Sequence, residues 1–396
     1  MSKQYQPKSF FRHSPNRFLQ QYFAARQVLA EVDFGNLSET QIDPIYEAWL
    51  ALPNQPRKEI EQDFQEIVEL ATESGSKAIM DEADFHGEEL APQFTMLEGF
   101  HEHAFWTFLE RPKYWRGALM LNHADNVPGK YWRKRKNLPN KAADVSENTI
   151  CKLAQALGEY FYTKQARGKN CKVECYKRDE RDYFFAYPED YANASIEWEG
   201  SEFKRRPHHP AFEIIFVYSR PERTLDIYMP GDRKAIADLQ AKFAEIVLQA
   251  QLGPDVKDER VYELSPLTSR QFQFDFDAAS GIQDVAVRKL RFKIAGTKEQ
   301  VILEADTTQN KHAIFDLLDK VTKGIPANRI LINQVGIKVT FVQTPSSRRK
   351  NVRSFDIGWP NSCSLKQDGR DRIIRELLIK SGIEPKELNE EVEFAA

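Results

Sequence analysis

A dense run of basic and aromatic residues is the part of the sequence that most clearly offers chemistry. It comprises Lys130, Tyr131, Trp132, Arg133, Lys134, Arg135 and Lys136. Lysine and arginine neutralise phosphates and release counterions, while flat aromatic rings stack on unpaired bases. Only Glu110 and Asp125 oppose this positive charge between residues 110 and 141. The run therefore predicts a nucleic-acid-binding surface on which its cations contact phosphates.

The same run is consistent with two other interpretations. Its cations can form the solvated face of a helix whose tryptophan and tyrosine belong to the core, where they balance acidic helices such as residues 59–69. They can also meet an acidic protein partner. The pattern by itself leaves these interpretations open.

Two further basic clusters lie far from the first one along the chain. One comprises Arg348, Arg349, Lys350 and Arg353, in a predicted loop between two strands, and we include it in the predicted nucleic-acid site. The other comprises Lys204, Arg205 and Arg206, followed by His208 and His209. Clusters so far apart act together only if folding brings them to one face of the molecule.

Three residues offer an enzymatic alternative. Asp190, Glu202 and Lys204 resemble the P-D…(D/E)-x-K arrangement of nucleases, in which two acids hold a divalent metal and the lysine helps to position the attacking water. The resemblance covers these few residues only. It departs from the pattern because an extra acid separates the proline from Asp190, and because the glycine and serine at 200–201 interrupt the strand expected to carry Glu202.

Other familiar catalytic and nucleotide-binding motifs are missing from the sequence. It contains no G-x-x-x-x-G-K-[ST] loop, no G-x-G-x-x-G and no G-x-S-x-G. Glu98 and His101 could share a helix face as metal ligands, but a second such pair is missing and His103 would point about 200° away from His101. We therefore expect no cofactor and no metal, and favour binding without intrinsic catalysis.

The composition limits which partners and which cellular compartment we expect for the protein. The 56 basic and 59 acidic residues give a net charge of -3, so a nucleic-acid partner must be argued from local clusters. Four scattered cysteines are typical of a reducing compartment, and no apolar run is long enough for a signal peptide or a membrane span. We expect a cytoplasmic protein without membrane contact that works with a protein partner or as a homo-oligomer.

The elements that must position these residues change type near Gly168, where the spacing of apolar residues along the sequence changes. Before it, apolar residues recur at helical spacing between cap signals: Asp144 and Glu147 predict one helix start, and another helix should run from Pro56 to Gly75. After it, apolar residues alternate as they do in strands. The predicted strands include residues 173–175, 183–187, 196–198, 212–218, 224–228, 261–264, 272–276, 285–294 and 330–342. The predicted fold class is α+β, with an all-helical N-terminal domain followed by an α+β part on mainly antiparallel sheets.

Two stretches of the second part, residues 212–247 and 290–321, share the order strand, turn, strand, helix. They can represent an internal duplication, or a common structural order that two unrelated segments share. We divide the chain into a helical domain at 1–168, a first α+β unit at 169–258, a second at 259–386 and an acidic tail at 387–396.

These observations lead to one preferred function and two alternatives. The preferred function is a nucleic-acid-binding or assembly subunit that acts in a multi-protein complex without intrinsic catalysis. The first alternative is a protein-interaction scaffold that binds an acidic partner. The second is a metal-dependent nuclease.

Overall fold

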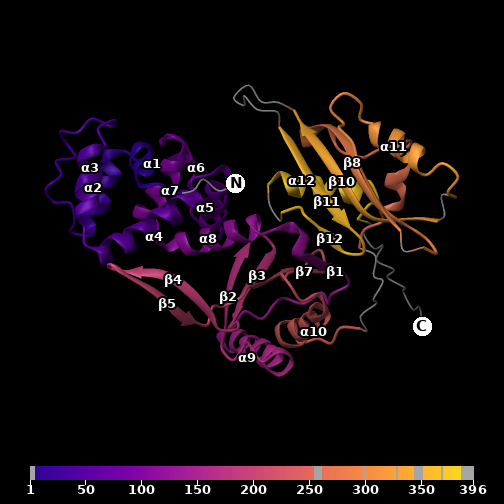
Figure 1. The fold of residues 1–396 in the computed structure, drawn as a ribbon, viewed down its shortest axis with the longest axis horizontal. Coiled ribbons are helices and arrows are strands. Elements are labelled where there is room, and N and C mark those ends of the chain that lie inside the picture. The colour runs from indigo at the N-terminus through magenta and orange to yellow at the C-terminus, as the bar shows by residue number, and fades with distance from the viewer. Residues whose placement is uncertain are drawn as a thin grey trace. The chain divides into compact units, whose positions relative to one another are not determined.

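The structure is a computed structural model that describes residues 5–253, 261–297, 299–326, 329–342, 351–366 and 369–384. It divides into two compact units (Figure 1): unit 1 comprises Met1–Asn126 and Gly158–Phe212, and unit 2 comprises Val127–Leu157 and Glu213–Ala396. The fold is α+β, as predicted. Helices occupy the chain as far as Asn126, and antiparallel strands with further helices follow.

Unit 1 begins with a series of helices around an aromatic core. They are α1 (Pro7–His13), α2 (Asn16–Ala25), α3 (Asp43–Ala51), α4 (Asn54–Leu70), α5 (Glu73–Phe85), α6 (Ala91–Phe94), α7 (Gly99–Glu110) and α8 (Pro112–Asn126). In the core, Phe10 and Phe64 stack with ring centroids 3.9 Å apart, and Tyr22 and Phe105 pack around them. The burial of these rings holds α1, α2, α4 and α7 together.

The corner between α4 and α5 corrects one prediction. The helix expected to run to Gly75 ends at Leu70, and α5 begins after Thr72, whose hydroxyl accepts a hydrogen bond from the Gly75 backbone N–H at 3.0 Å. A Cβ atom on Gly75 would lie 2.2 Å from the Leu70 carbonyl oxygen. Gly75 therefore permits a close approach of two helices, where the sequence had suggested the end of one.

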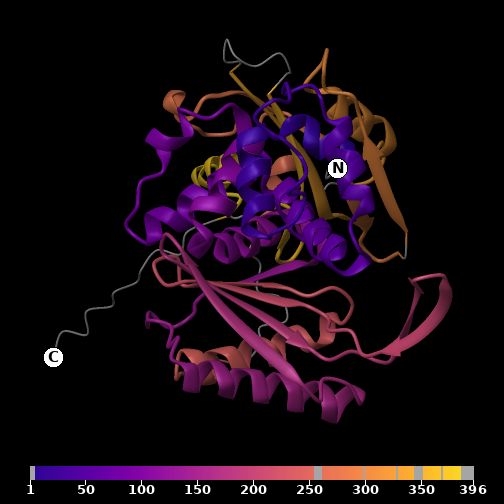
Figure 2. The same cartoon turned by 90° about the vertical axis from the view of Figure 1, so that its left-hand side faces the viewer.

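Unit 1 also contains two antiparallel strand pairs, which confirm the predicted strands in this region. β2 (Cys171–Arg178) pairs with β3 (Arg181–Pro188), and β4 (Asn193–Glu199) pairs with β5 (Glu202–His208). Figure 2 shows the β4–β5 hairpin extending away from β2 and β3. The hairpin turns at residues 200–201, which is where the sequence predicted that the strand would be interrupted.

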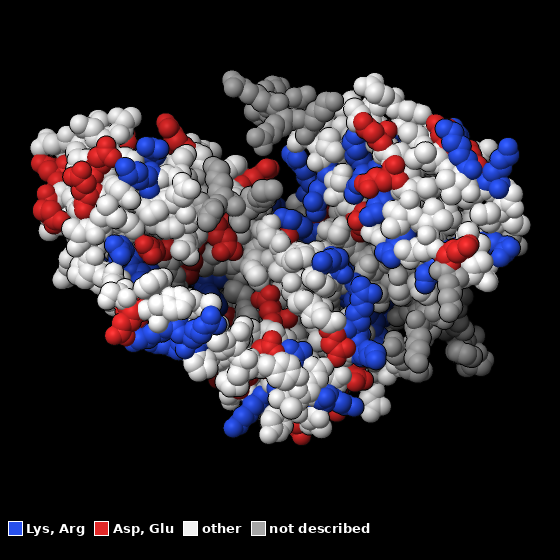
Figure 3. All heavy atoms as spheres, viewed as in Figure 1, with Lys and Arg blue, Asp and Glu red and all other residues white. Residues whose placement is uncertain are grey.

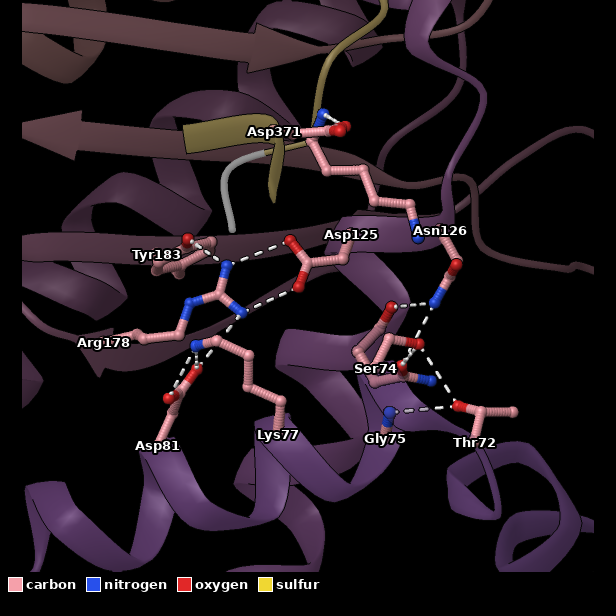
Figure 4. A network of polar contacts seen from close by, with 12 residues as sticks. Thr72, Ser74, Gly75, Lys77, Asp81, Asp125, Asn126, Arg178, Tyr183 and Asp371 are labelled. Carbon is pink, nitrogen blue, oxygen red and sulfur yellow. Dashed lines mark hydrogen bonds and ion pairs between the residues drawn. The ribbon is translucent and has the colours of Figure 1, made fainter. Parts of the chain in front are cut away.

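A buried ion pair joins β2 to the helices of unit 1 (Figure 4). The Arg178 guanidinium donates to both carboxylate oxygens of Asp125 on α8, at 2.8 and 2.9 Å, and to the Tyr183 hydroxyl at 2.8 Å. On α5, Lys77 donates to both oxygens of Asp81 at 3.0 Å. These bidentate hydrogen bonds compensate the charges of the paired side chains, which would otherwise be costly to bury.

In unit 2, a first group of strands packs against one helix. Its elements are η1 (Gly129–Tyr131), β1 (Trp132–Arg135), β6 (Ile214–Ser219), β7 (Thr224–Tyr228), η2 (Arg233–Ala235) and α10 (Ile236–Val247). β7 pairs with both β1 and β6 in antiparallel register, and the Phe243 ring of α10 stacks on Phe216 of β6. α9 (Glu147–Gln165) begins where the cap signals predicted, with Asp144 accepting from the Ser146 N–H and the Thr149 hydroxyl.

The second group in unit 2 is a five-stranded antiparallel sheet in the order β12-β11-β10-β8-β9. Its elements are β8 (Ile282–Ile294), β9 (Gln300–Glu304), α11 (Ala313–Val321), β10 (Ile330–Phe341), β11 (Val352–Gly358), β12 (Ser362–Cys363) and α12 (Arg370–Lys380). Sheet residues such as Leu290, Phe292 and Ile337 form one buried core with Ile314 of α11 and Leu377 of α12. Because side chains alternate along a strand, the opposite face of the sheet carries the intervening polar residues.

The predicted order of strand, turn, strand, helix occurs twice in unit 2, as β6, β7, α10 and as β8, β9, α11. Two predicted strands, residues 261–264 and 272–276, are wrong: these stretches are irregular and flank the short helix η3 (Ser265–Thr268). Phe272 and Phe274 instead pack edge to face, with centroids 5.1 Å apart, against the core. None of the described helices has both the length and the apolar composition needed to cross a membrane.

Candidate functional site

A cleft of about 750 Å³ in unit 2 gathers residues from distant parts of the chain. Its cationic lining residues are Lys130, Arg133, Arg233, Arg291 and Lys293, and its acidic ones are Glu263 and Asp356. The volume lies within the roughly 300 to 1,000 Å³ of typical ligand sites. Figure 3 shows Lys and Arg atoms gathered on this face of unit 2, over the region that Figure 1 labels β1, β7 and α10.

One wall of the cleft is the turn that leads into β1. Gly129 lies so close to Ser364 that a Cβ atom would approach the Ser364 Cα to 2.4 Å, and the Lys134 N–H donates to the Asn361 carbonyl at 3.1 Å. These contacts tie η1 and β1 to the end of β12. The Lys130 ammonium lies 4.8 Å from the centre of the Tyr131 ring, which keeps its charged end at the exposed rim.

Two arginines that line the cleft, Arg133 of β1 and Arg233 of η2, lie near one another and have no ion-pair partner among the described residues. Arg133 donates to the carbonyls of Lys130 at 2.9 Å and Trp132 at 2.6 Å, which fixes its guanidinium. Burial, together with the nearby charge of Arg233, lowers the pKa of Arg133 to about 10, so the group stays cationic at neutral pH. An anion placed beside both groups would relieve this repulsion.

The floor of the cleft is the face of the five-stranded sheet that points away from the core shared with α11 and α12. Arg291 and Lys293 alternate along β8 with buried Leu290 and Phe292, and the Arg291 guanidinium donates to the Gln300 side chain of β9 at 3.1 Å. Leu331 of β10 lies opposite Lys293 and is 53% exposed. The floor therefore combines cations with exposed aliphatic surface.

The turn between β11 and β12 supplies an aromatic ring. Trp359 lines the cleft and its side chain is 41% exposed. Its backbone N–H donates to the Asn333 carbonyl at 3.0 Å, and the following Pro360 carbonyl accepts from the Val261 and Tyr262 N–H groups at 3.1 and 3.4 Å. The ring therefore projects from a turn whose backbone is held on two sides.

Both acids of the cleft already have hydrogen-bond donors. Asp356 accepts from Gln334 at 3.1 Å and from Arg288 at 3.5 Å, and Glu263 accepts from the Ser265 N–H at 3.0 Å. In the described part of the chain, by contrast, the five cleft cations take part in no ion pair. The cleft is therefore electrostatically suited to an anionic ligand.

The predicted basic run divides between the cleft and the interior. Lys130 and Arg133 line the cleft, whereas Trp132 and Lys134 are buried in unit 2. Tyr131 is half-buried, and Arg135 donates to the Gly253 carbonyl at 3.1 Å. Lys136 is half-buried close enough to Glu384 to lower the pKa of that carboxyl. Side-chain alternation along β1 sends Arg133 and Lys134 to opposite faces, which a run of adjacent charges conceals.

Lys134 belongs to a buried charge cluster. Its ammonium donates to Glu384 at 2.8 Å and lies 4.0 Å from Asp226 on β7. Arg375 of α12 is also buried and donates to the carbonyls of Leu365 and Lys366. Burial lowers the pKa of Lys134, but the carboxylates of Glu384 and Asp226 outweigh it and hold the pKa above its ordinary value.

The second predicted basic group is only partly described. Arg353 donates two hydrogen bonds to buried Asp371, at 2.7 and 2.6 Å, which gives it a structural ion pair. Arg348, Arg349 and Lys350 lie outside the described residues.

The residues of the nuclease alternative lie in unit 1 and have ion-pair partners. Asp190 accepts from Arg167 at 2.8 Å, and Lys204 on β5 pairs with Glu199 at 2.7 Å and with Glu202 at 2.9 Å. Across the described ranges, no group of three or more histidine, cysteine, aspartate or glutamate side chains is arranged to hold a metal ion. The geometry therefore offers this alternative no support.

Sequence reasoning missed Arg233, Arg291, Lys293 and Trp359. For Arg291 and Lys293 a signal was present, since basic and apolar residues alternate along a strand that was itself predicted. Arg233 and Trp359 lie in a short helix and a turn, where no periodicity marks an exposed side chain. A comparison with protein-family models, with curated proteins and with solved structures finds no match for this chain.

Proposed function

We propose that unit 2 binds nucleic acid by its phosphates, in the cleft lined by Lys130, Arg133, Arg233, Arg291 and Lys293. The observation that carries the proposal is the convergence of these cations from three separate segments of the chain on one cleft, without ion-pair partners among the described residues. Isolated surface lysines are common and need no ligand. Five cations around one cavity repel one another, so their arrangement is explained better by a polyanion.

A phosphate polymer suits this site for two physical reasons. Each neutralised phosphate releases condensed counterions, which favours association at moderate salt. Arginine also presents a planar set of donors that matches phosphate oxygens, and three of the five cations are arginines. The hydroxyl and amide side chains that share the lining, Ser265, Ser364 and Gln300 among them, can add neutral hydrogen bonds to phosphate or sugar.

The test is the salt dependence of binding to a fluorescent oligonucleotide, measured by anisotropy. Each phosphate contact contributes roughly -0.7 to -0.9 to the slope of log K against log salt. Replacing Arg233, Arg291 and Lys293 with alanine should flatten the slope by about two to three. These three are chosen because Arg133 also supports the backbone and Lys130 lies over an aromatic ring.

A matched control comes from the helical side of the same sheet. Lys311, Lys320 and Lys323 flank or end α11, which packs on the opposite face, and their removal changes the net charge by the same amount. This control should leave the slope unchanged. Equal effects of the two triple variants would mean that only overall charge matters, and the cleft proposal would then be wrong.

A competition experiment distinguishes nucleic-acid binding from the alternative of an acidic protein partner. Polyglutamate carries negative charge without phosphates, sugars or bases. If it displaces the oligonucleotide as well as an unlabelled oligonucleotide of equal charge does, the cleft binds acidic polypeptides and the scaffold function becomes the better proposal. A large excess of polyglutamate should be needed if the ligand is nucleic acid.

A further inference from the structure

We infer that the cleft takes a single strand and stacks one unpaired base on Trp359. This inference rests on the proposed function and specifies its substrate: single-stranded nucleic acid in preference to duplex. It begins from the position of the ring. Trp359 is a large aromatic side chain, 41% exposed, in a cleft whose other walls carry cations.

The turn that carries the ring is held in place before any ligand arrives. The Trp359 N–H donates to the Asn333 carbonyl, and the Pro360 carbonyl accepts from Val261 and Tyr262. Gly358, just before the tryptophan, approaches Ser362 so closely that a Cβ atom would lie 2.6 Å from the Ser362 hydroxyl oxygen. A stacking surface on such a supported turn loses little conformational entropy on binding.

The surroundings of the ring suit a base on one side and phosphates on the other. Leu331, 53% exposed, lines the same cleft and provides apolar surface on which a base or sugar can lie. Arg291 and Lys293 share the β8–β10 floor, and Arg133 and Arg233 line the wall. Aromatic rings beside tracks of cations are the usual means of binding single strands without sequence reading.

A duplex cannot use this ring without paying to unpair a base. In a duplex, the faces of the bases are covered by their stacked neighbours, and extruding one costs a few kcal/mol. Phosphate contacts alone would remain available to a duplex. The cleft should therefore bind duplex through its cations only, and a single strand through both cations and ring.

The experiment compares Trp359→Ala with the unmodified protein on three probes: a single-stranded DNA 12-mer, the same 12-mer as duplex, and a 12-mer of abasic sites that keeps its phosphates. Trp359→Ala should weaken the ordinary single strand roughly 5- to 150-fold, the equivalent of the ~1 to 3 kcal/mol of one stacked base. The abasic strand and the duplex should change less than about twofold. Trp359→Phe should recover most of the affinity, because it keeps a flat ring.

Two controls guard against trivial outcomes. Trp198→Ala removes a tryptophan that is 64% exposed on the β4–β5 hairpin of unit 1 and should leave all three affinities unchanged. Retained binding of the abasic strand by Trp359→Ala shows that the cleft itself is intact. If abasic binding falls as well, the ring acts by supporting the turn and not by stacking on a base, which would overturn the inference.

The two proposals fail differently. If the triple cation variant leaves the salt slope unchanged, the phosphate-binding function is wrong, whatever Trp359 does. If the triple variant behaves as expected but Trp359→Ala weakens single strand and duplex equally, or neither, the cleft binds phosphates without base stacking. The single-strand inference alone is then refuted.

Discussion

Replacing Lys134 with methionine tests whether the buried charge cluster anchors β1. The lysine side chain is only 4% exposed, and its ammonium faces Glu384 at 2.8 Å and Asp226 at 4.0 Å. Methionine keeps the length of the side chain but removes the charge, so two buried carboxylates lose their shared cation. Breaking a buried ion pair from one side costs about 3 to 5 kcal/mol. This is a large part of the roughly 5 to 15 kcal/mol that stabilises a typical domain.

The assay is unfolding in urea together with hydrogen exchange of the β1 and α12 amides. We expect the urea midpoint to fall by more than about 1 M, given slopes of about 1 to 3 kcal/mol per M. Exchange should accelerate in β1 and around Glu384, because these two segments are joined through Lys134 although they lie 250 positions apart. Arg133 lies in β1, so affinity for an oligonucleotide should also fall.

The double variant Lys134→Met, Glu384→Leu supplies the internal control. Removing both partners leaves less uncompensated charge, and apolar replacements of buried pairs are often neutral or stabilising. The double variant should therefore lose less stability than Lys134→Met alone. If Lys134→Met costs less than about 1 kcal/mol, or if the two substitutions are simply additive, the cluster does not anchor β1 and the reasoning is refuted.

The pH dependence of the stability lost in Lys134→Met follows from the same cluster. Burial raises the pKa of Glu384, but the charges of Lys134 and Arg375 outweigh burial and hold the pKa below the ordinary 4.5. The contribution of Glu384 to stability is therefore present above pH 4.5 and is lost as the pH falls through the folded pKa. The pKa of Lys134 is held above 10.5, so its contribution is present below that pH and is lost as the pH rises further. The deficit of Lys134→Met should be constant between about pH 5 and pH 10 and should shrink in acid, where Glu384 becomes protonated.

Two further predictions concern unit 1. Gly75→Ala should destabilise the protein by about 1 to 3 kcal/mol or more, measured by urea unfolding, because its Cβ atom would lie 2.2 Å from the Leu70 carbonyl oxygen; a neutral result would mean that the α4–α5 corner can open. Lys204→Ala should leave any Mg²⁺-dependent oligonucleotide cleavage unchanged, because Lys204 and Asp190 pair with different partners. Loss of cleavage in that variant, with binding retained, would make the nuclease the better proposal.

Much of the fold follows from local patterns. Helical spacing before Gly168, alternation in the strands of unit 2 and the repeated order of strand, turn, strand, helix are properties of neighbouring residues. The structure has all three, except that the strand β1 (Trp132–Arg135) lies inside the stretch before Gly168 that was predicted to be all-helical. The cap at Asp144 was equally legible, since the donors it satisfies lie two and five residues away. The failures at residues 261–264 and 272–276 arise because apolar residues at strand-like spacing can be buried by packing against the core as well as in a paired strand.

The candidate site depended on tertiary structure. The sequence by itself determined that positive charge concentrates at residues 130–136, but it did not determine which of those charges reach the surface. Lys134 can be buried because its ammonium pairs with Glu384, 250 residues away in the sequence. Arg133 lies near Arg233 only because β1 pairs with β7. Local patterns record which face of an element a residue occupies. Which faces meet is set by long-range packing, and that is why Lys293 and Trp359 could be assigned to the cleft only once the chain was folded.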